Sequence, residues 1–162
     1  MTKGIIFGTA VGALFLLGCN ATATTAPTPA SGSSVTCTTI TKDEAAKLFD
    51  RWNASLAEND PAKVVENYAQ DSLLLPTLSD TPRFSAAEKE DYFKHFLESK
   101  PSGKIDQRFI DIGCNYVVDS GHYTFTLNAD GTEVKARYTF TYEYTDGKWL
   151  ITSHHSSVLP KK

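Results

Sequence analysis

The sequence lacks any cluster of lysine and arginine residues. Its formal net charge is −3, with 16 basic side chains set against 19 acidic ones. Proteins that bind nucleic acid need basic side chains gathered on one surface to contact phosphates. We therefore expect no nucleic-acid partner. The Gly-x-Gly-x-x-Gly fingerprint of dinucleotide-binding domains is also absent, and we expect neither a cofactor nor a metal ion.

Cysteine is scarce, and its three positions are far apart: Cys19, Cys37 and Cys114. No Cys-x-x-Cys pair is present, which disfavours a zinc site and thioredoxin-like redox chemistry. In an oxidising compartment Cys37 and Cys114 would form a disulfide that joins the start of the folded domain to a later strand. The alternative is two unrelated small buried side chains.

Long apolar runs are missing except near the N-terminus, at residues 4–17. Lys3 precedes this run, and Leu16-Leu17-Gly18-Cys19 ends it, which is the pattern of a bacterial lipoprotein signal with Cys19 as the lipidated residue. A transmembrane helix needs about 20 apolar residues, so the run favours a signal peptide. We predict a signal over 1–18 and a protein exported and lipid-anchored to the cell envelope, on its periplasmic or outer-membrane side. The alternative is an uncleaved N-terminal anchor.

Residues 19–36 are rich in Thr, Ala, Pro and Ser. Such a segment buries too little apolar surface to offset the entropy of ordering it, so we interpret it as a flexible tether. One folded domain is then expected over residues 37–160.

Helix signals fill the first half of this domain. Thr41 and Glu44 form a capping box before a stripe of apolar residues at helical spacing, which predicts a helix from Thr41 onward. Asn59-Asp60-Pro61 ends that helix and begins a second, short one. Ser85 and Glu88 form another capping box, which predicts a third helix ending near Glu98.

Strand signals fill the second half. Alternating or β-branched runs predict strands over 71–75, 104–113, 115–118, 123–127, 134–144 and 148–158. The turns are expected at 119–121, at 128–131 and at Asp146-Gly147. Helices first and an antiparallel meander afterwards indicate an α+β domain with the helices packed on one face of the sheet.

Several phrases resemble NTF2-like domains. The opening phrases are Leu48-Phe49-Asp50-Arg51-Trp52-Asn53, Asn59-Asp60-Pro61 and Tyr68-Ala69-Gln70-Asp71. The closing phrases are Ala136-Arg137-Tyr138-Thr139-Phe140, Asp146-Gly147-Lys148-Trp149-Leu150 and His154-His155-Ser156-Ser157-Val158-Leu159-Pro160. The ending looks like the association (hub) domain of calcium/calmodulin-dependent protein kinase II, and closer still to the stand-alone bacterial relatives of that domain.

This resemblance covers about residues 37–160 and implies a cone. Three N-terminal helices would pack on a strongly curved antiparallel or mixed sheet that encloses an internal pocket. The resemblance also implies homodimers through the outer face of the sheet, or larger rings. No kinase segment or calmodulin-binding segment is present, so kinase activity is not implied.

Arg137 is the candidate anion-binding residue of the pocket. The resemblance places an arginine at this position inside the cone, where a guanidinium needs a carboxylate partner or an anionic ligand. The alternative is an exposed strand arginine paired with Glu133 or Glu143. No aspartate is predicted to face inward from a strand, because Asp106 and Asp111 lie near strand ends and Asp119 and Asp130 fall in expected turns.

His154 and His155 are adjacent and so face opposite ways on a strand. Counting in steps of two from Trp149 places His155 and Ser157 inside, and we take His155 as the candidate catalytic base; the alternative is a buried structural histidine. Trp52 and Tyr68 are candidates for the pocket wall, or equally for the core.

Two functions follow from these residues. The first is an oligomerising cell-envelope domain that binds a small, anionic ligand at Arg137. The second is a pocket enzyme of the isomerase or dehydratase (SnoaL-like) type that uses His155 and Arg137. A third possibility is assembly alone, with a vestigial pocket.

Overall fold

The computed structural model of the protein describes residues 36–160. The predicted signal peptide, the predicted lipidation site Cys19 and nearly all of the predicted tether over 19–36 lie outside the described residues. Within the described range, no helix is long and apolar enough to cross a membrane.

The helices begin where the capping signals predict. Thr41 accepts a hydrogen bond from the Glu44 amide at 3.2 Å, and the Glu44 carboxylate accepts one from the Thr41 amide at 2.9 Å. Ser85 and Glu88 form the same reciprocal pair, and Asp60 caps the short middle helix. These contacts satisfy amides that have no partner inside the helix. The helices are α1 (Lys42–Leu56), α2 (Pro61–Val65) and α3 (Ala86–Glu98).

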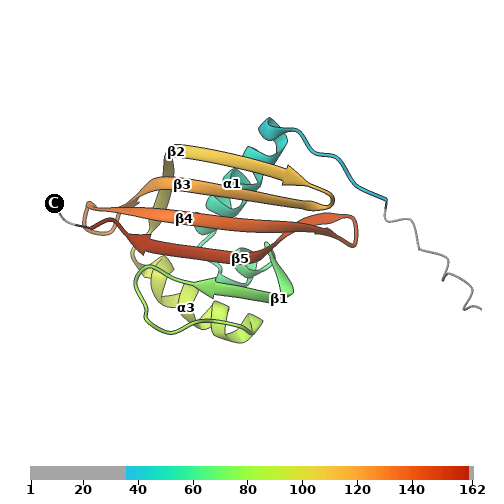
Figure 1. The fold of residues 1–162 in the computed structure, drawn as a ribbon. Helices are drawn as coiled ribbons and strands as arrows, with labels where there is room; N and C mark the ends of the chain where they lie inside the picture. Colours follow the sequence, from blue (N-terminus) through green and yellow to red (C-terminus); the bar gives the residue numbers. More distant parts are fainter. Residues whose placement is uncertain (1–35, 161–162) are drawn as a thin grey trace, which may run out of the picture. The chain divides into compact units, whose positions relative to one another are not determined.

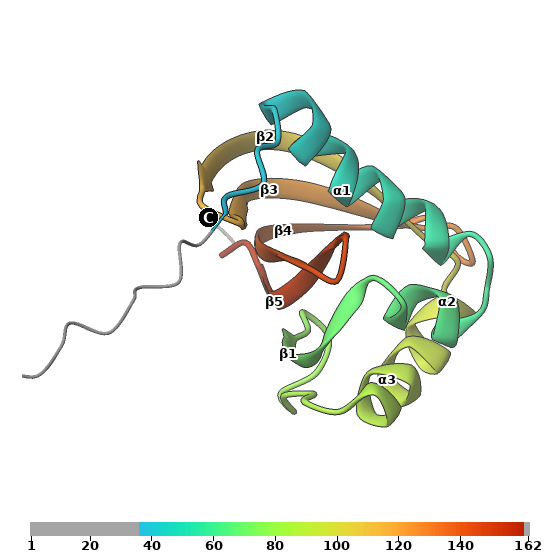
Figure 2. The ribbon, with the colours of Figure 1, turned by 90° about the vertical axis from the view of Figure 1, so that its right-hand side faces the viewer.

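The strands form one mixed, curled sheet in the order β1-β5-β4-β3-β2. β1 pairs with β5 in parallel, and all other pairs are antiparallel. The helices lie on the concave face, while the outer face carries no helix (Figures 1 and 2). The predicted α+β architecture is confirmed. The strands are β1 (Tyr68–Leu75), β2 (Pro101–Gly113), β3 (Tyr116–Leu127), β4 (Thr132–Thr145) and β5 (Lys148–Val158).

One predicted turn is wrong. Residues 119–121 do not turn; they lie inside β3, and the β2–β3 hairpin turns instead at Cys114 and Asn115, with Asn115 at φ 61°. Gly121 is needed for another reason. A Cβ atom on Gly121 would lie 1.9 Å from the Gln107 carbonyl oxygen of β2, so only glycine permits the two strands to approach this closely.

Two β-bulges change which side chains face inward. On β5, Ser153 pairs with Thr141 but Ile151 pairs with Tyr142, so Thr152 is an extra residue. On β2, Ile105 pairs with Tyr123 but Gln107 pairs with His122, so Asp106 is extra. An extra residue moves every later side chain of its strand to the opposite face.

Aromatic side chains fill the space between α1 and the sheet. Phe49 lies 5.9 Å from Phe140 and Trp52 lies 5.2 Å from the same ring, both with edge-to-face geometry. Tyr142 and Phe140 are both 0% exposed. Edge-to-face aromatic pairs stabilise a core beyond their area alone, so β4 contributes the rigid centre of the domain.

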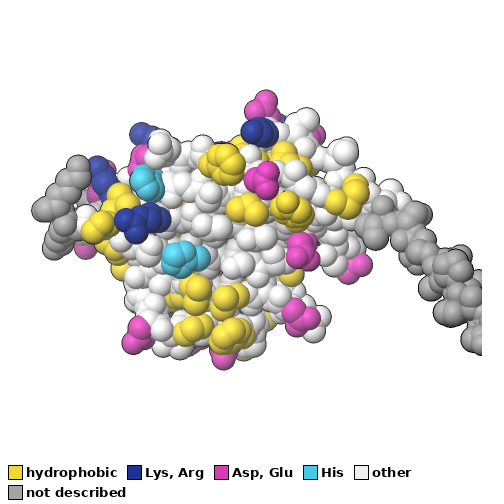
Figure 3. Space-filling model, viewed as in Figure 1, with side chains coloured by type: hydrophobic (Ala, Val, Ile, Leu, Met, Phe, Trp, Pro, Cys, Tyr) yellow, Lys and Arg dark blue, Asp and Glu magenta, His cyan; other side chains and the backbone are white. Residues whose placement is uncertain are grey.

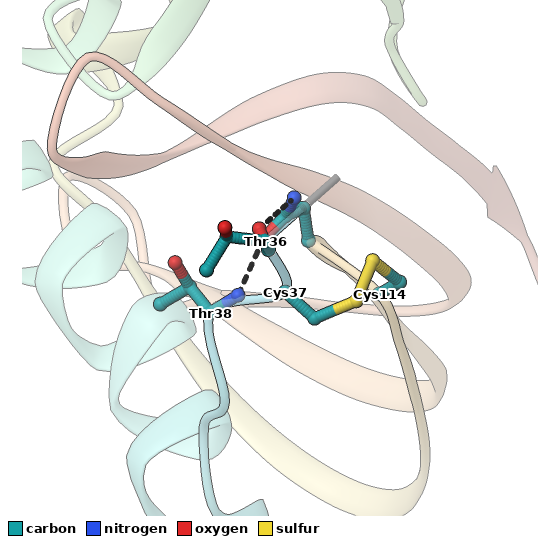
Figure 4. Close-up of a disulfide and its surroundings, with 5 residues drawn as sticks. Thr36, Cys37, Thr38 and Cys114 are labelled. Carbon is teal, nitrogen blue, oxygen red and sulfur yellow. Dashed lines mark hydrogen bonds between the residues drawn. A yellow bond between two sulfur atoms is a disulfide. The ribbon is translucent and has the colours of Figure 1, made fainter. Parts of the chain in front are cut away.

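The predicted disulfide is confirmed between Cys37 and Cys114, which are 77 positions apart (Figure 4). Asn115 reinforces it, because its side-chain oxygen accepts a hydrogen bond from the Thr38 amide at 2.7 Å and its side-chain nitrogen donates to the Thr36 carbonyl at 3.1 Å. The segment before α1 is thus held to the β2–β3 turn.

Replacing both Cys37 and Cys114 by serine should lower the free energy of unfolding by about 4 kcal/mol, because the bond closes a long loop in the unfolded chain. Urea denaturation monitored by tryptophan fluorescence measures this, and reduced wild-type protein should match the variant. A loss below about 1 kcal/mol would mean that the hydrogen bonds of Asn115 suffice to hold the segment.

Candidate functional site

A small cavity lies between α3, the segment after β1 and the inner face of β3, β4 and β5. Its volume is about 30 Å³, which gives room for about two water molecules. Most of the wall is apolar, and none of the lining side chains is charged. Apolar walls come from residues on four elements: Leu74, Phe93, Phe96, Phe125 and Val134.

Three hydroxyl groups meet at one side of this cavity. Tyr123 of β3 donates a hydrogen bond to Ser156 Oγ of β5 at 2.5 Å. Ser156 in turn shares a hydrogen bond with Thr77, which follows β1. Burial raises the pKa of Tyr123 to about 12, so its phenol keeps its proton at neutral pH. Two of the three hydroxyl hydrogens are used within the group, which therefore offers one hydrogen and several lone pairs to whatever occupies the cavity.

His154 lies beside these hydroxyls and is 4% exposed. Its Nδ1 forms a hydrogen bond with the Tyr68 hydroxyl at 2.9 Å, and its ring stacks on Phe140 at 3.9 Å. Burial is the main cause that lowers the pKa of His154 to about 3, with a smaller contribution from His155. The imidazole is therefore neutral at physiological pH, and its buried Nε2 has no hydrogen-bond partner within residues 36–160.

The structure corrects the predicted face of β5. His155 is exposed and Ser157 is half-buried on the outer face, while His154 and Ser156 are buried inside. The count in steps of two fails at the bulge, because Thr152 adds one residue between Ile151 and His154. His155 is therefore not placed to act as a base in the pocket.

Arg137 does not enter the pocket either. It is exposed on the outer face, where it pairs across the sheet with His122 and Ser157. On β4 the inward positions belong to large apolar and aromatic side chains that pack against α1, and a guanidinium among them would lose its hydration. Its exposure agrees with the alternative interpretation, but within residues 36–160 Arg137 forms no ion pair with Glu133 or Glu143.

Of the two other residues predicted for the pocket wall, one lines the cavity and the other does not. Trp52 is 1% exposed and lines the cavity, as predicted. Tyr68, at the start of β1, is not part of the lining but holds His154 through the hydrogen bond to Nδ1. Thr77 and Tyr123 were not among the predicted site residues, because nothing in the sequence indicates that a hydroxyl after β1 and one on β3 meet at Ser156.

The arginine that does face inward is Arg108 of β2. Its Nε lies 3.2 Å from Oδ1 of Asp119, which also accepts a hydrogen bond from the Tyr138 hydroxyl at 2.9 Å. Asp119 is 0% exposed; burial raises its pKa, and the charge of Arg108 opposes this. The guanidinium also lies 5.6 Å from the centre of the Phe49 ring. Arg108 alternates along the strand in step with Ile110 and Ile112, and this pattern could have predicted from the sequence that Arg108 faces inward.

This ion pair lies in the interior of the domain, and neither of its residues lines the cavity. Within residues 36–160, no group of three His, Cys, Asp or Glu side chains is placed to hold a metal ion.

The free energy of unfolding should fall as the pH is lowered from about 6.5 toward 3, because the unfolded chain then protonates His154 and the folded chain does not. The contribution of this residue amounts to about 1.4 kcal/mol per pH unit. Urea denaturation at several pH values should show a shallower slope for His154→Gln than for the wild type. The matched variant of the outer face, His155→Gln, should keep the His154 contribution; equal slopes in wild type and His154→Gln would contradict the buried, neutral imidazole.

The sequence model of one family, the calcium/calmodulin dependent protein kinase II association domain, matches residues 41–160. No match was found among curated proteins. A solved structure from Xanthomonas campestris, described as such an association domain, is 45% identical and superposes with a TM-score of 0.72, covering 80% of this chain and 99% of that one.

Two further solved structures share the fold at low identity. One is the iota-carbonic anhydrase of a cyanobacterium in complex with bicarbonate, with 21% identity, a TM-score of 0.68, and coverage of 80% of this chain and 99% of that one. The other is an NTF2-like protein with a cystatin-like fold from Novosphingobium aromaticivorans, with 11% identity, a TM-score of 0.62, and coverage of 74% and 82%. The curled sheet, the helices on its concave face and the match over 41–160 show that the chain belongs to the calcium/calmodulin-dependent protein kinase II association-domain family, within the NTF2-like fold.

Proposed function

We propose that this protein is an exported, lipid-anchored domain that associates with copies of itself and holds one small oxygen-bearing molecule, of the size of carbon dioxide or bicarbonate, beside Ser156. The observation that carries the proposal is the group of three hydroxyls and one neutral imidazole at the side of an otherwise apolar cavity.

Cavity size limits the ligand. A volume of about 30 Å³ takes a molecule of about two waters in size, such as carbon dioxide or bicarbonate. This volume favours such small molecules over the ring-sized substrates of isomerases and dehydratases. The residues that the isomerase or dehydratase hypothesis requires, His155 and Arg137, also lie on the outer face.

Cavity chemistry fits the same ligands. The apolar wall of Phe93, Phe96 and Val134 suits the uncharged carbon dioxide molecule. Thr77 and Ser156 can hold a water molecule or a bicarbonate oxygen by hydrogen bonds. The similarity in fold to a carbonic anhydrase that binds bicarbonate supports hydration of carbon dioxide as the reaction to test.

The full-length chain should accelerate loss of ¹⁸O from labelled bicarbonate, as measured by membrane-inlet mass spectrometry. Removing one pocket hydroxyl by Ser156→Ala should lower this rate about fivefold, since one hydrogen bond contributes about 1 kcal/mol. The neighbouring outward variant Ser157→Ala should keep the wild-type rate. Equal losses in both variants, or no exchange above that of buffer together with no broadening of the ¹³C signal of bicarbonate, would contradict the proposal.

Self-association is assigned to the outer face of the sheet. This face carries no helix and presents apolar side chains between polar ones (Figures 2 and 3). Phe109 of β2 is 65% exposed and Tyr116 of β3 is 40% exposed. Exposed apolar patches of this kind mark interaction surfaces. Membership of an association-domain family supports a homodimer or a larger ring through this face.

Phe109→Lys should shift the protein from an oligomer to a monomer, because two copies of the face would then bring like charges together in a desolvated contact. Light scattering after size-exclusion chromatography measures the molar mass. Phe84 provides the control: it is 62% exposed and precedes α3, so Phe84→Lys should leave the oligomer intact. A wild-type monomer, or an unchanged Phe109→Lys oligomer, would exclude this face.

A further inference from the structure

We infer that Tyr68 is a positioning residue that holds the His154 ring with its hydrogen on Nε2, so that the cavity presents an N–H donor and selects a ligand through an acceptor oxygen. The position of the hydrogen is an inference about the protein alone. The identity of the ligand rests on the proposed function.

The imidazole ring has a fixed orientation. It stacks on Phe140 at 3.9 Å and meets the edge of Trp52 at 5.1 Å, while Nδ1 is tied to Tyr68 at 2.9 Å. His154 and Tyr68 are 4% and 6% exposed. Turning the ring over would break the bond to Tyr68 inside the core, so Nε2 remains the atom without a protein partner.

Either Tyr68 or His154 could donate in this hydrogen bond. If Tyr68 donates, only the Nε2 hydrogen of His154 is left without a partner. If Nδ1 donates, the Tyr68 hydrogen has no acceptor among residues 36–160, and the Nε2 lone pair is unpaired as well. The first arrangement leaves one buried group unsatisfied rather than two, and buried polar groups are seldom left unsatisfied.

The surroundings of Tyr68 also favour donation from its hydroxyl to Nδ1 of His154. Burial raises the pKa of Tyr68 well above its ordinary value, and the Trp52 indole N–H opposes this in part, so the phenol keeps its hydrogen. The ammonium group of Lys89 lies 5.9 Å from the centre of the Tyr68 ring. A positive charge there makes the phenol a stronger hydrogen-bond donor toward His154.

Lys89 is a buried cation without an acidic partner. It is 1% exposed, and it donates to the Ser72 carbonyl at 2.8 Å and the Phe84 carbonyl at 2.5 Å. No carboxylate within the described residues lies within ion-pair distance of its Nζ. Because no charged side chain lines the cavity, this cation behind Tyr68 favours an anionic occupant.

The ligand class follows from these donors. The Nε2 hydrogen of His154 and the one hydroxyl hydrogen that the Ser156–Thr77 hydrogen bond leaves free are able to donate toward the same space. A small oxyanion such as bicarbonate or formate offers acceptor oxygens to these groups, whereas a small ammonium ion brings only donors and a positive charge.

Long-range ¹H–¹⁵N NMR of the uniformly labelled full-length chain at pH 7 reads the hydrogen position directly. Wild-type His154 should show the pattern of an Nε2-protonated neutral ring. Tyr68→Phe should give a mixture of tautomers. Tyr92→Phe is the matched control, because Tyr92 lines the cavity without a hydrogen bond to His154, and it should keep the wild-type pattern.

A hydrogen on Nδ1 in the wild type would overturn the inference, and so would an unchanged pattern in folded Tyr68→Phe. If Tyr68→Phe does not fold, the wild-type spectrum still decides, because it reports the position of the hydrogen without any variant.

Titration with sodium formate should move the Nε2 signal of wild-type His154 to saturation, with an affinity about tenfold weaker in Tyr68→Phe. Methylammonium chloride at equal ionic strength should leave the signal unmoved. If Nε2 carries the hydrogen but neither formate nor bicarbonate moves the signal, the proposed function fails and the role of Tyr68 stands. A response to methylammonium alone would overturn the selection of acceptor oxygens.

Discussion

One extra residue in β5 determines what the cavity can do. Thr152 has no partner of its own in the β4–β5 ladder, and the bulge moves every later side chain of β5 to the other face. His154 and Ser156 therefore face the interior, and His155 and Ser157 face solvent. Without the bulge, the cavity would keep its apolar wall but would exchange both of its β5 polar groups for their exposed neighbours.

The inner face of the sheet separates its polar groups into two clusters around an aromatic centre. Phe49, Phe140 and their neighbours fill the middle with edge-to-face contacts. Tyr123 directs its hydroxyl to Ser156, while Tyr138, whose ring lies 4.9 Å away, directs its hydroxyl to Asp119. The Asp119 cluster includes Arg108 in an ion pair. Within residues 36–160, both clusters keep buried atoms without a hydrogen-bond partner: Arg108 Nη2 and Asp119 Oδ2 in the first, and His154 Nε2 in the second. Of the two clusters, only that of His154 lines the cavity, and this position identifies it as the one with capacity for a ligand.

Local signals predicted the elements well, because they act over three or four residues. The capping boxes at Thr41 and Ser85 and the Asp146-Gly147 turn needed no knowledge of distant residues. The disulfide spans 77 positions and was predicted instead because the domain holds only two cysteines. The bulges could not be predicted, because a residue is extra only relative to the pairing with the neighbouring strand, which the sequence does not give. Gly121 was mistaken for a turn signal for the same reason: its cause is the carbonyl of Gln107 on the neighbouring strand. The prediction that Arg137 lies inside the pocket came from family resemblance. The aromatic side chains on the inner face of β4 leave no room for a guanidinium there.

The most direct test of this account is chemical modification of the adjacent histidines by diethyl pyrocarbonate in the folded chain, with the modified residue identified by tandem mass spectrometry. The account predicts rapid modification of His155 and protection of His154, with His154 reacting only after denaturation. Rapid modification of His154 with protection of His155 would show that β5 has no bulge in solution, and both the proposed ligand site and the role of Tyr68 would then be wrong.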